Sequence, residues 1–130
     1  MSDARQVGAA RRRPGRLSRS AEFDRVYRQG RAVANRYLVL YTFPREGSDA
    51  PRVGLSVGRK VGGAVERNQV KRLLREACAQ HVDALPPGHD LVVVARADAH
   101  ALAGEQGLDG IGAALEELLA KAGGGGGAPA

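Results

Sequence analysis

The sequence has little of several residue types, and each shortage excludes a class of protein. Cys78 is the single cysteine, so an internal disulfide is impossible and a secreted disulfide scaffold is excluded. No apolar run approaches the ~20 residues of a membrane-spanning helix, and no apolar stretch of a signal peptide follows the N-terminal arginines. We therefore expect a cytoplasmic protein with no membrane partner.

Lysine is also scarce, whereas arginine is abundant. All but three of the 20 cationic side chains are arginine, and the formal net charge is +6. Residues 1–36 hold ten arginines against three acids, and residues 52–76 hold seven cations against two acids. Positive charge gathered in two segments is typical of a surface that meets a polyanion, and the guanidinium fork suits phosphate. The composition therefore favours a nucleic-acid-binding protein.

The chain of 130 residues suits one domain with a modest core. Residues 1–16 are rich in Arg, Gly and Ala but poor in apolar side chains, which predicts a disordered basic arm. Residues 123–130, GGGGGAPA, predict a disordered tail of low complexity. We expect the folded domain over residues 17–122.

Hydrophobic periodicity inside this domain predicts alternating helices and strands. Apolar residues three and four apart indicate helices, expected over residues 20–29, 64–82 and 110–123. Short β-branched or alternating segments indicate strands, expected over residues 32–35, 37–43, 52–58 and 90–96. The order α-β-β-β-α-β-α predicts an α/β (α+β) two-layer sandwich with the sheet covered by helices and the strand 90–96 in its centre.

Two details of these elements carry further expectations. Ser20 is a good N-cap for the first helix, and Gly30 is typical of its C-terminal stop. In the strand 52–58, Gly54 and Ser56 are expected on one face, opposite to Val53 and its apolar neighbours. The missing side chain at Gly54 leaves room for another group to approach the backbone closely.

The stretch 58–77, GRKVGGAVERNQVKRLLREA, joins a glycine-rich turn to a basic helix. A phosphate-binding enzyme loop, G-x-x-x-x-G-K-[ST], needs a hydroxyl after its lysine to hold magnesium, but Val61 follows Lys60 here. Projected at about 100° per residue, the helix presents cations and one amide on one side and apolar residues on the other. We therefore expect a surface for RNA phosphates, made by Arg59, Lys60, Arg67, Asn68, Lys71, Arg72 and Arg75.

This stretch resembles the protein subunit of bacterial ribonuclease P. The hallmark of that family is an Arg-Asn-x-x-Lys-Arg-x-x-Arg run entering a helix, which is matched by residues 67–75. The similarity covers about residues 17–121 and includes RLSRSAEFDRVYRQGRAVANRYLVLY and DLVVVAR. It implies an α/β sandwich with a left-handed β-α-β crossover, which periodicity does not predict because ~98% of such crossovers are right-handed.

The resemblance also implies a function. The family's enzyme is a ribonucleoprotein that removes the 5′ leader of precursor tRNA, and its RNA subunit holds the active site and the Mg²⁺ ions. The protein would have no catalytic residues, no tightly bound metal and no obligate protein partner, and would be inactive alone. The seven residues above would bind the catalytic RNA, and a cleft between the first helix and the sheet would bind the leader through Phe23, Tyr27, Asn35, Arg36 and Tyr41.

The aromatic side chains fit this picture, although other readings stay open. All five lie within residues 23–43, and single-stranded RNA is held by aromatic platforms flanked by cations. Phe23, Tyr27 and Tyr41 could instead fill the core, as we expect for Tyr37 and Phe43. Alternative functions are a non-catalytic RNA-binding or ribosome-associated module of the same fold, and a stand-alone metal-dependent nuclease. The second requires clustered carboxylates, whereas the acids here are scattered along the sequence.

Overall fold

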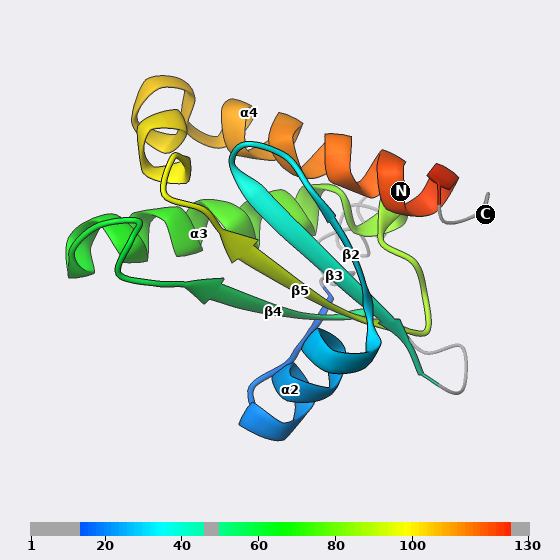
Figure 1. The fold of residues 1–130 in the computed structure, drawn as a ribbon. Coiled ribbons are helices and arrows are strands. Elements are labelled where there is room, and N and C mark those ends of the chain that lie inside the picture. Colours follow the sequence, from blue (N-terminus) through cyan, green and yellow to red (C-terminus); the bar gives the residue numbers. More distant parts are fainter. Residues whose placement is uncertain (1–13, 46–49, 126–130) are drawn as a thin grey trace, which may run out of the picture.

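A five-stranded sheet with helices on both faces forms the protein, shown as a ribbon in Figure 1. The structure is a computed structural model that describes residues 14–45 and 50–125. Helices α3 and α4 lie side by side on one face of the sheet, and the short helix α2 lies on the other (Figure 1). The predicted α/β sandwich is confirmed, with α2 as a partial cover of the outer face.

The elements follow one another in nearly the predicted order. They are β1 (Gly15–Arg16), α2 (Ser20–Gln29), β2 (Arg31–Ala34), β3 (Leu38–Pro44), β4 (Arg52–Val57), α3 (Ala64–Gln80), the 3₁₀ turn η1 (Val82–Ala84), β5 (His89–Ala95), α4 (Ala99–Ala120) and the π turn η2 (Lys121–Gly125). In space the strands run β1-β4-β5-β3-β2, so β5 is central as predicted. Strands β4 and β5 are parallel neighbours joined through α3, whereas β3 is antiparallel to β5 and β2. That this β4-α3-β5 crossover is left-handed stays a prediction.

The main core lies between the sheet and helices α3 and α4. Alternate residues of the central strands, such as Leu40 and Val93, point to this side and pack with apolar residues of both helices. The residues between them point to α2, where Val92 packs with Val26 and Leu17. Because side chains alternate across a strand, the doubly apolar strands β3 and β5 build both layers at once.

Helix α2 has the predicted bounds, but its N-terminus is capped differently. Arg19, not Ser20, is the N-cap residue. The Glu22 carboxylate accepts hydrogen bonds from the backbone N–H groups of Ser18 (3.4 Å) and Arg19 (3.3 Å), so it makes the carboxylate half of a capping box. Gly30 ends the helix as predicted, and an added Cβ there would lie 2.6 Å from the Thr42 carbonyl oxygen.

The last helix begins earlier than the sequence indicates. The prediction of a start at residue 110 is wrong, because α4 already begins at Ala99 and is interrupted at Gly107, whose φ is +57°. Glycines at 104 and 107 lower the helical propensity of this first part. Burial of Leu102 and Ala103 in the main core outweighs that local cost. Helix α3, in turn, ends two residues before the predicted Val82.

The sheet also recruits residues assigned to the N-terminal arm. Gly15 and Arg16 form β1, parallel to β4, and the Leu17 N–H donates to the Val53 carbonyl oxygen at 3.0 Å. Pairing with β4 therefore begins inside the segment expected to be disordered. The rest of the predicted arm, residues 1–13, and the end of the predicted tail, residues 126–130, lie outside the described residues. The exact domain limits stay a prediction.

Candidate nucleic-acid interface

The polar side of α3 forms a continuous basic face, which we define as Arg67, Asn68, Lys71, Arg72 and Arg75. Three of these residues are exposed and two are partly buried. The opposite side of the helix, including Val70 and Leu74, is fully buried in the main core. Within residues 14–45 and 50–125, the ion pairs involve Arg36, Arg45 and Arg52, so the basic face keeps its charges uncompensated.

The turn before α3 places two more cations at the end of this face. Arg59 and Lys60 are exposed, while Val61 between them and the helix is buried and anchors the turn. Gly62 has φ +154°, and a Cβ there would lie 2.8 Å from Cβ of Glu66, so this position requires glycine. Gly63 is the N-cap and provides no side-chain hydrogen bond, which leaves first-turn N–H groups open to an anion.

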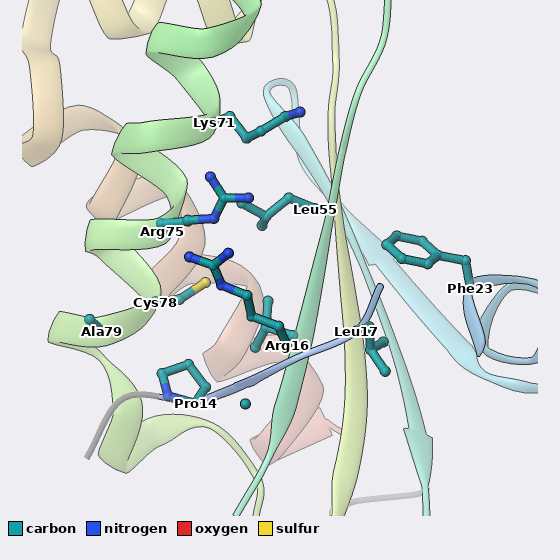
Figure 2. Close-up of a pocket in the computed structure, with 11 residues that line it drawn as sticks. Pro14, Arg16, Leu17, Phe23, Leu55, Lys71, Arg75, Cys78 and Ala79 are labelled. Atoms are coloured by element: carbon teal, nitrogen blue, oxygen red, sulfur yellow. The ribbon is translucent and has the colours of Figure 1, made fainter. Parts of the chain in front are cut away.

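Within the basic face, Lys71 and Arg75 differ from the outer residues. Figure 2 shows both side chains extending from α3 toward strand β4, and both line a pocket there, whereas Asn68 and Arg72 are not among its lining residues. Cys78, one turn further, is 2% exposed and belongs to the main core. Burial raises the pKa of its thiol to about 12, as expected for a packed residue and not for a nucleophile.

On the other face of the sheet, α2 and β3 bring together an aromatic cluster, Phe23, Tyr27 and Tyr41. The Tyr27 ring meets the Tyr41 ring edge-on at 5.0 Å between centroids, and it lies 6.3 Å from the Phe23 ring. Tyr27 is 36% exposed, whereas the other two rings pack partly against Val92 and Val26. The structure therefore groups three of the five residues predicted for the leader cleft, and one of them offers much of its surface.

A flat strip of sheet continues from this cluster. Strand registers place Ala34, Val39, Val94 and Ser56 in one row across β2, β3, β5 and β4. Each of these residues is at least partly exposed, because α2 is too short to cover them. Val39 lies two residues from Tyr41 on the same face of β3, so this row of the sheet adjoins the aromatic cluster.

Gly54 explains how Phe23 comes to lie against the sheet. A Cβ on Gly54 would lie 2.5 Å from Cζ of Phe23 and 3.0 Å from Cβ of Leu17. The close approach expected at this glycine is therefore made by the protein's own α2. Phe23 is therefore compatible with both interpretations of the sequence: it packs on the sheet as a core residue does, and it borders Tyr27 in the aromatic cluster.

Asn35 and Arg36 lie apart from the aromatic cluster, in the turn between β2 and β3. The Asn35 amide donates to the Ala114 carbonyl oxygen (3.0 Å) and to Glu117 (2.9 Å), both on α4. Its oxygen accepts the backbone N–H groups of Tyr37 and Leu38, so the Asn35 side chain both closes the turn and fixes it against α4. A role of Asn35 in leader binding stays a prediction, because its described contacts are structural.

Arg36 is more accessible than Asn35. Its Nε donates to Asp98 at 2.9 Å, and its guanidinium lies 5.5 Å from the centroid of the Tyr37 ring. The side chain remains 72% exposed in this pair. Hydrogen bonding to Asp98 raises the pKa of Arg36, which keeps the guanidinium charged. An exposed ion pair of this kind is weak enough for a phosphate to replace the carboxylate.

An ion-pair network that the sequence did not reveal fixes α2 to the sheet. Arg52 on β4 donates to both oxygens of Asp90 on β5, at 2.9 Å each, and to Glu22 on α2 at 3.2 Å. Arg45 adds an ion pair to Asp90 at 3.2 Å. Asp90 appeared in the sequence only as one scattered acid, since the parallel register that places it opposite Arg52 has no sequence signal.

Two further searches concern metals and membranes. Within the described ranges, no three His, Cys, Asp or Glu side chains lie together as ligands for a metal ion. Among the helices of the same ranges, none is long and apolar enough to cross a membrane. Cys78 and His81, the one Cys–His pair close in sequence, are occupied by core packing and by a 2.9 Å contact of His81 Nδ1 with the Ala77 carbonyl oxygen.

Comparison with known proteins decides the family. The family model described as Ribonuclease P matches residues 12–123, which includes the basic face and the aromatic cluster. The chain belongs to the ribonuclease P protein family. Among its relatives, the ribonuclease P protein component of Halalkalibacterium halodurans is 48% identical over 91 residues, which are 70% of this chain and 76% of the relative. That of Shouchella clausii is 41% identical over 82% of this chain and 84% of the relative.

Solved ribonuclease P proteins have the same fold. The Staphylococcus aureus protein superposes with a TM-score of 0.73 at 36% identity, covering 82% of this chain and 94% of that one. The Thermotoga maritima protein superposes with a TM-score of 0.72 at 28% identity, covering 80% and 94%. This chain is accordingly a ribonuclease P protein component, part of an endoribonuclease of tRNA processing.

Proposed function

We propose that this protein binds the catalytic RNA of ribonuclease P through its basic face together with Arg59 and Lys60. The same protein would bind the 5′ leader of precursor tRNA through the aromatic cluster and the adjoining strip of sheet. It promotes 5′ maturation in the cytoplasm by holding two RNA partners, and it supplies no catalytic residue itself. The observation that carries this proposal is that the two surfaces are built on different elements, the basic face on α3 and the aromatic cluster on α2 and β3.

The charge pattern supports the first contact. The cations of the basic face recur at three- and four-residue spacing on one side of α3, and side chains at that spacing lie about 5–6 Å apart. None of them makes an ion pair with another described residue, so phosphate binding requires no internal contact to be broken. Buried Leu73 and Leu74 hold the helix against the sheet and keep this row of charge in place.

The aromatic cluster supports the second contact. A base stacked on an aromatic side chain contributes ~1–3 kcal/mol and requires no particular sequence, which suits leaders that differ from one tRNA to another. Tyr27 is the most accessible ring of the cluster, and its edge-on contact with Tyr41 holds it in position. Arg36 would provide a cation at the far end of β3.

Magnesium is proposed to belong mainly to the RNA subunit. The described part of the protein does not offer the carboxylate cluster that a two-metal centre requires. Its buried acid, Asp90, is already engaged by Arg45 and Arg52. The role of the protein is then to hold catalytic RNA and substrate together, which lowers the magnesium concentration that the RNA needs.

Reconstitution tests the proposal. The protein is mixed with its cognate catalytic RNA and a leader-bearing precursor tRNA at low magnesium, and 5′ processing is followed over time. We expect faster processing with the protein than with the RNA alone, and no cleavage by the protein alone. Absence of any gain would refute the proposed function.

The protein-alone reaction also tests a second activity. One similar solved structure is described as a Staphylococcus aureus RNase P protein mutant with defective mRNA degradation activity. An mRNA substrate should therefore be included beside the precursor tRNA. Cleavage of either RNA by this protein without the catalytic RNA would contradict the absence of catalytic residues.

A further inference from the structure

A small pocket lies at the β1–β4 edge of the sheet, and its lining reaches from α3, next to the basic face, to Leu17 and Phe23 on the α2 side. Its volume is about 150 Å³, and we call it the edge pocket. Leu55 and Cys78 form part of its apolar lining, and Figure 2 shows them between α3 and β4. Residues 14–17 form one side of the pocket and α3 forms another; β1 pairs only with residues 52 and 53 of β4, so Leu55 in the lining lies beyond the paired stretch.

Three cations surround this apolar lining. Arg16 comes from β1, whereas Lys71 and Arg75 come from α3, and Figure 2 shows the Arg16 and Arg75 side chains extending into the same gap from opposite sides. The residues that line the pocket include no carboxylate, and none of the three cations makes an ion pair with a described residue. Like charges that converge without a counter-charge are stabilised by a bound anion.

The strand edge adds hydrogen-bonding groups. The Val53 carbonyl oxygen points to this edge, where it accepts the Leu17 N–H. Peptide groups alternate between the two edges of a strand, so the N–H and C=O of Leu55 point the same way, beyond the end of β1. No described strand covers them there. The pocket thus offers one donor and one acceptor beside an apolar space.

These features together select the chemistry of the occupant. A cavity of about 150 Å³ is large enough for one benzene-sized ring. An aromatic ring fits the apolar space, and polar groups on its edge can hydrogen-bond to the Leu55 peptide. A phosphate attached to the ring would meet the three cations.

We propose that the edge pocket receives one unpaired base of the catalytic RNA, with the adjoining phosphate between Arg16, Lys71 and Arg75. The inference rests on the proposed function, since it takes the catalytic RNA as the ligand of α3. It goes further by dividing the basic face. Asn68 and Arg72 contact backbone phosphates from the exposed side, whereas Lys71 and Arg75 hold a nucleotide that is turned out of its strand. Arg16 thereby becomes an RNA-binding residue.

Filling the pocket tests the inference. Ala79 lines the pocket and is partly exposed, so Ala79→Leu adds volume there without changing charge or helical propensity much. Ala113→Leu makes the same change at an exposed position of α4 outside the pocket lining and serves as the control. Each protein is bound to the cognate catalytic RNA, and base reactivity to dimethyl sulfate is mapped together with affinity.

We expect the wild type and Ala113→Leu to protect one base, or two neighbouring bases, of the RNA from dimethyl sulfate. The same bases should react freely when the RNA is bound to Ala79→Leu. Affinity should fall about 10- to 150-fold, the range for losing the burial of one apolar group the size of a large side chain, while protection elsewhere remains. An RNA made abasic at that position should bind the wild type more weakly by a similar factor. Ala79→Leu should bind the abasic RNA as well as it binds the unmodified RNA. Arg16→Gln, on the opposite wall, should expose the same base.

Other outcomes would overturn the inference. If both Ala79→Leu and Arg16→Gln leave every base protection unchanged while the wild type binds and activates the RNA, the inference is wrong and the proposed function stands. If the wild type does not bind the RNA, both fail. If Ala79→Leu instead turns a dimer into a monomer with an unchanged footprint, the open edge of β4 binds another protein strand and not a base.

Discussion

Arg52 and Asp90 face each other across two parallel strands and form a two-pronged ion pair at the base of α2. Nε and Nη2 of Arg52 donate to Oδ1 and Oδ2 of Asp90, each at 2.9 Å. Asp90 is 1% exposed, and Arg52 reaches onward to Glu22. Helix α2 carries two rings of the aromatic cluster, so this pair positions the proposed leader cleft through the sheet and does not contact RNA itself.

Loss of the Asp90 charge should destabilise the fold strongly. In Asp90→Asn, Arg45 loses its counter-charge and Arg52 keeps only Glu22, and breaking a buried pair in this way costs about 3–5 kcal/mol. Urea unfolding at neutral pH measures the change in the free energy of unfolding. Asp98→Asn is the control, because it breaks the exposed pair with Arg36 and should barely move the midpoint. Equal effects of the two variants would contradict the role of the network.

Glu22 makes the attachment of α2 sensitive to acid. Hydrogen bonds from backbone N–H groups, first that of Arg19, and the charge of Arg52 lower the pKa of Glu22 in the folded protein. The carboxylate therefore stabilises the fold above its unfolded pKa of about 4.3, and this contribution disappears as the pH falls through the lowered folded pKa. Unfolding free energies of the wild type and Glu22→Gln should differ at pH 7 and converge at acid pH. A difference that is independent of pH would show that the ionised carboxylate is not the cause.

A methyl group on Gly54 should disturb the aromatic cluster. In Gly54→Ala the added Cβ meets Cζ of Phe23 at 2.5 Å, so the ring must move and the overpacking should cost about 1–3 kcal/mol. Phe23→Leu shortens the opposing side chain, so a double-mutant cycle by urea unfolding should give a favourable coupling between the two substitutions. Gly58→Ala is the matched control, because nothing lies within 4 Å of its added Cβ. Additive effects of Gly54→Ala and Phe23→Leu would disprove the contact.

The two proposed RNA surfaces should fail in different ways. Arg72→Ala removes one exposed cation, so binding of the catalytic RNA should weaken and its logarithmic salt dependence should become shallower by about one. Tyr27→Ala should leave that binding unchanged but weaken leader-bearing precursor by ~1–3 kcal/mol relative to mature tRNA. Filter binding over a range of salt, with both substrates, distinguishes the two. The same defect in both variants would contradict the division into two surfaces.

Local patterns predicted the elements that satisfy their own periodicity. Helix α2 has its predicted bounds, and the apolar residues of α3 face the core as projected. Prediction was wrong for the first part of α4, because two glycines weaken the local signal and only packing of Leu102 on the core reveals the helix. Strand β1 was missed for a similar reason, since two residues carry no periodicity and form a strand only by pairing with β4.

The same distinction holds for the candidate site, where local patterns predicted the basic face but not the contacts of Asn35 and Tyr27. Charge and spacing along one helix identified the basic face, because all its members lie within nine residues of sequence. Asn35 and Tyr27 were grouped by position in a family pattern, yet one contacts α4 and the other lies on the α2 side of the sheet. Sequence patterns do not tell which face of a turn an isolated polar residue will join.

By itself the sequence indicated the class of this protein, and it predicted a polyanionic partner and the helix that would meet it, since these depend on composition and on contacts between near neighbours in the chain. Only the tertiary structure decided that Arg52 meets Asp90, that Phe23 lies on Gly54, and that Arg16 joins Lys71 and Arg75 around a pocket. Each of these contacts joins residues from different elements. Their partners are chosen by strand register and helix docking, which depend on how the whole core packs and not on any local pattern.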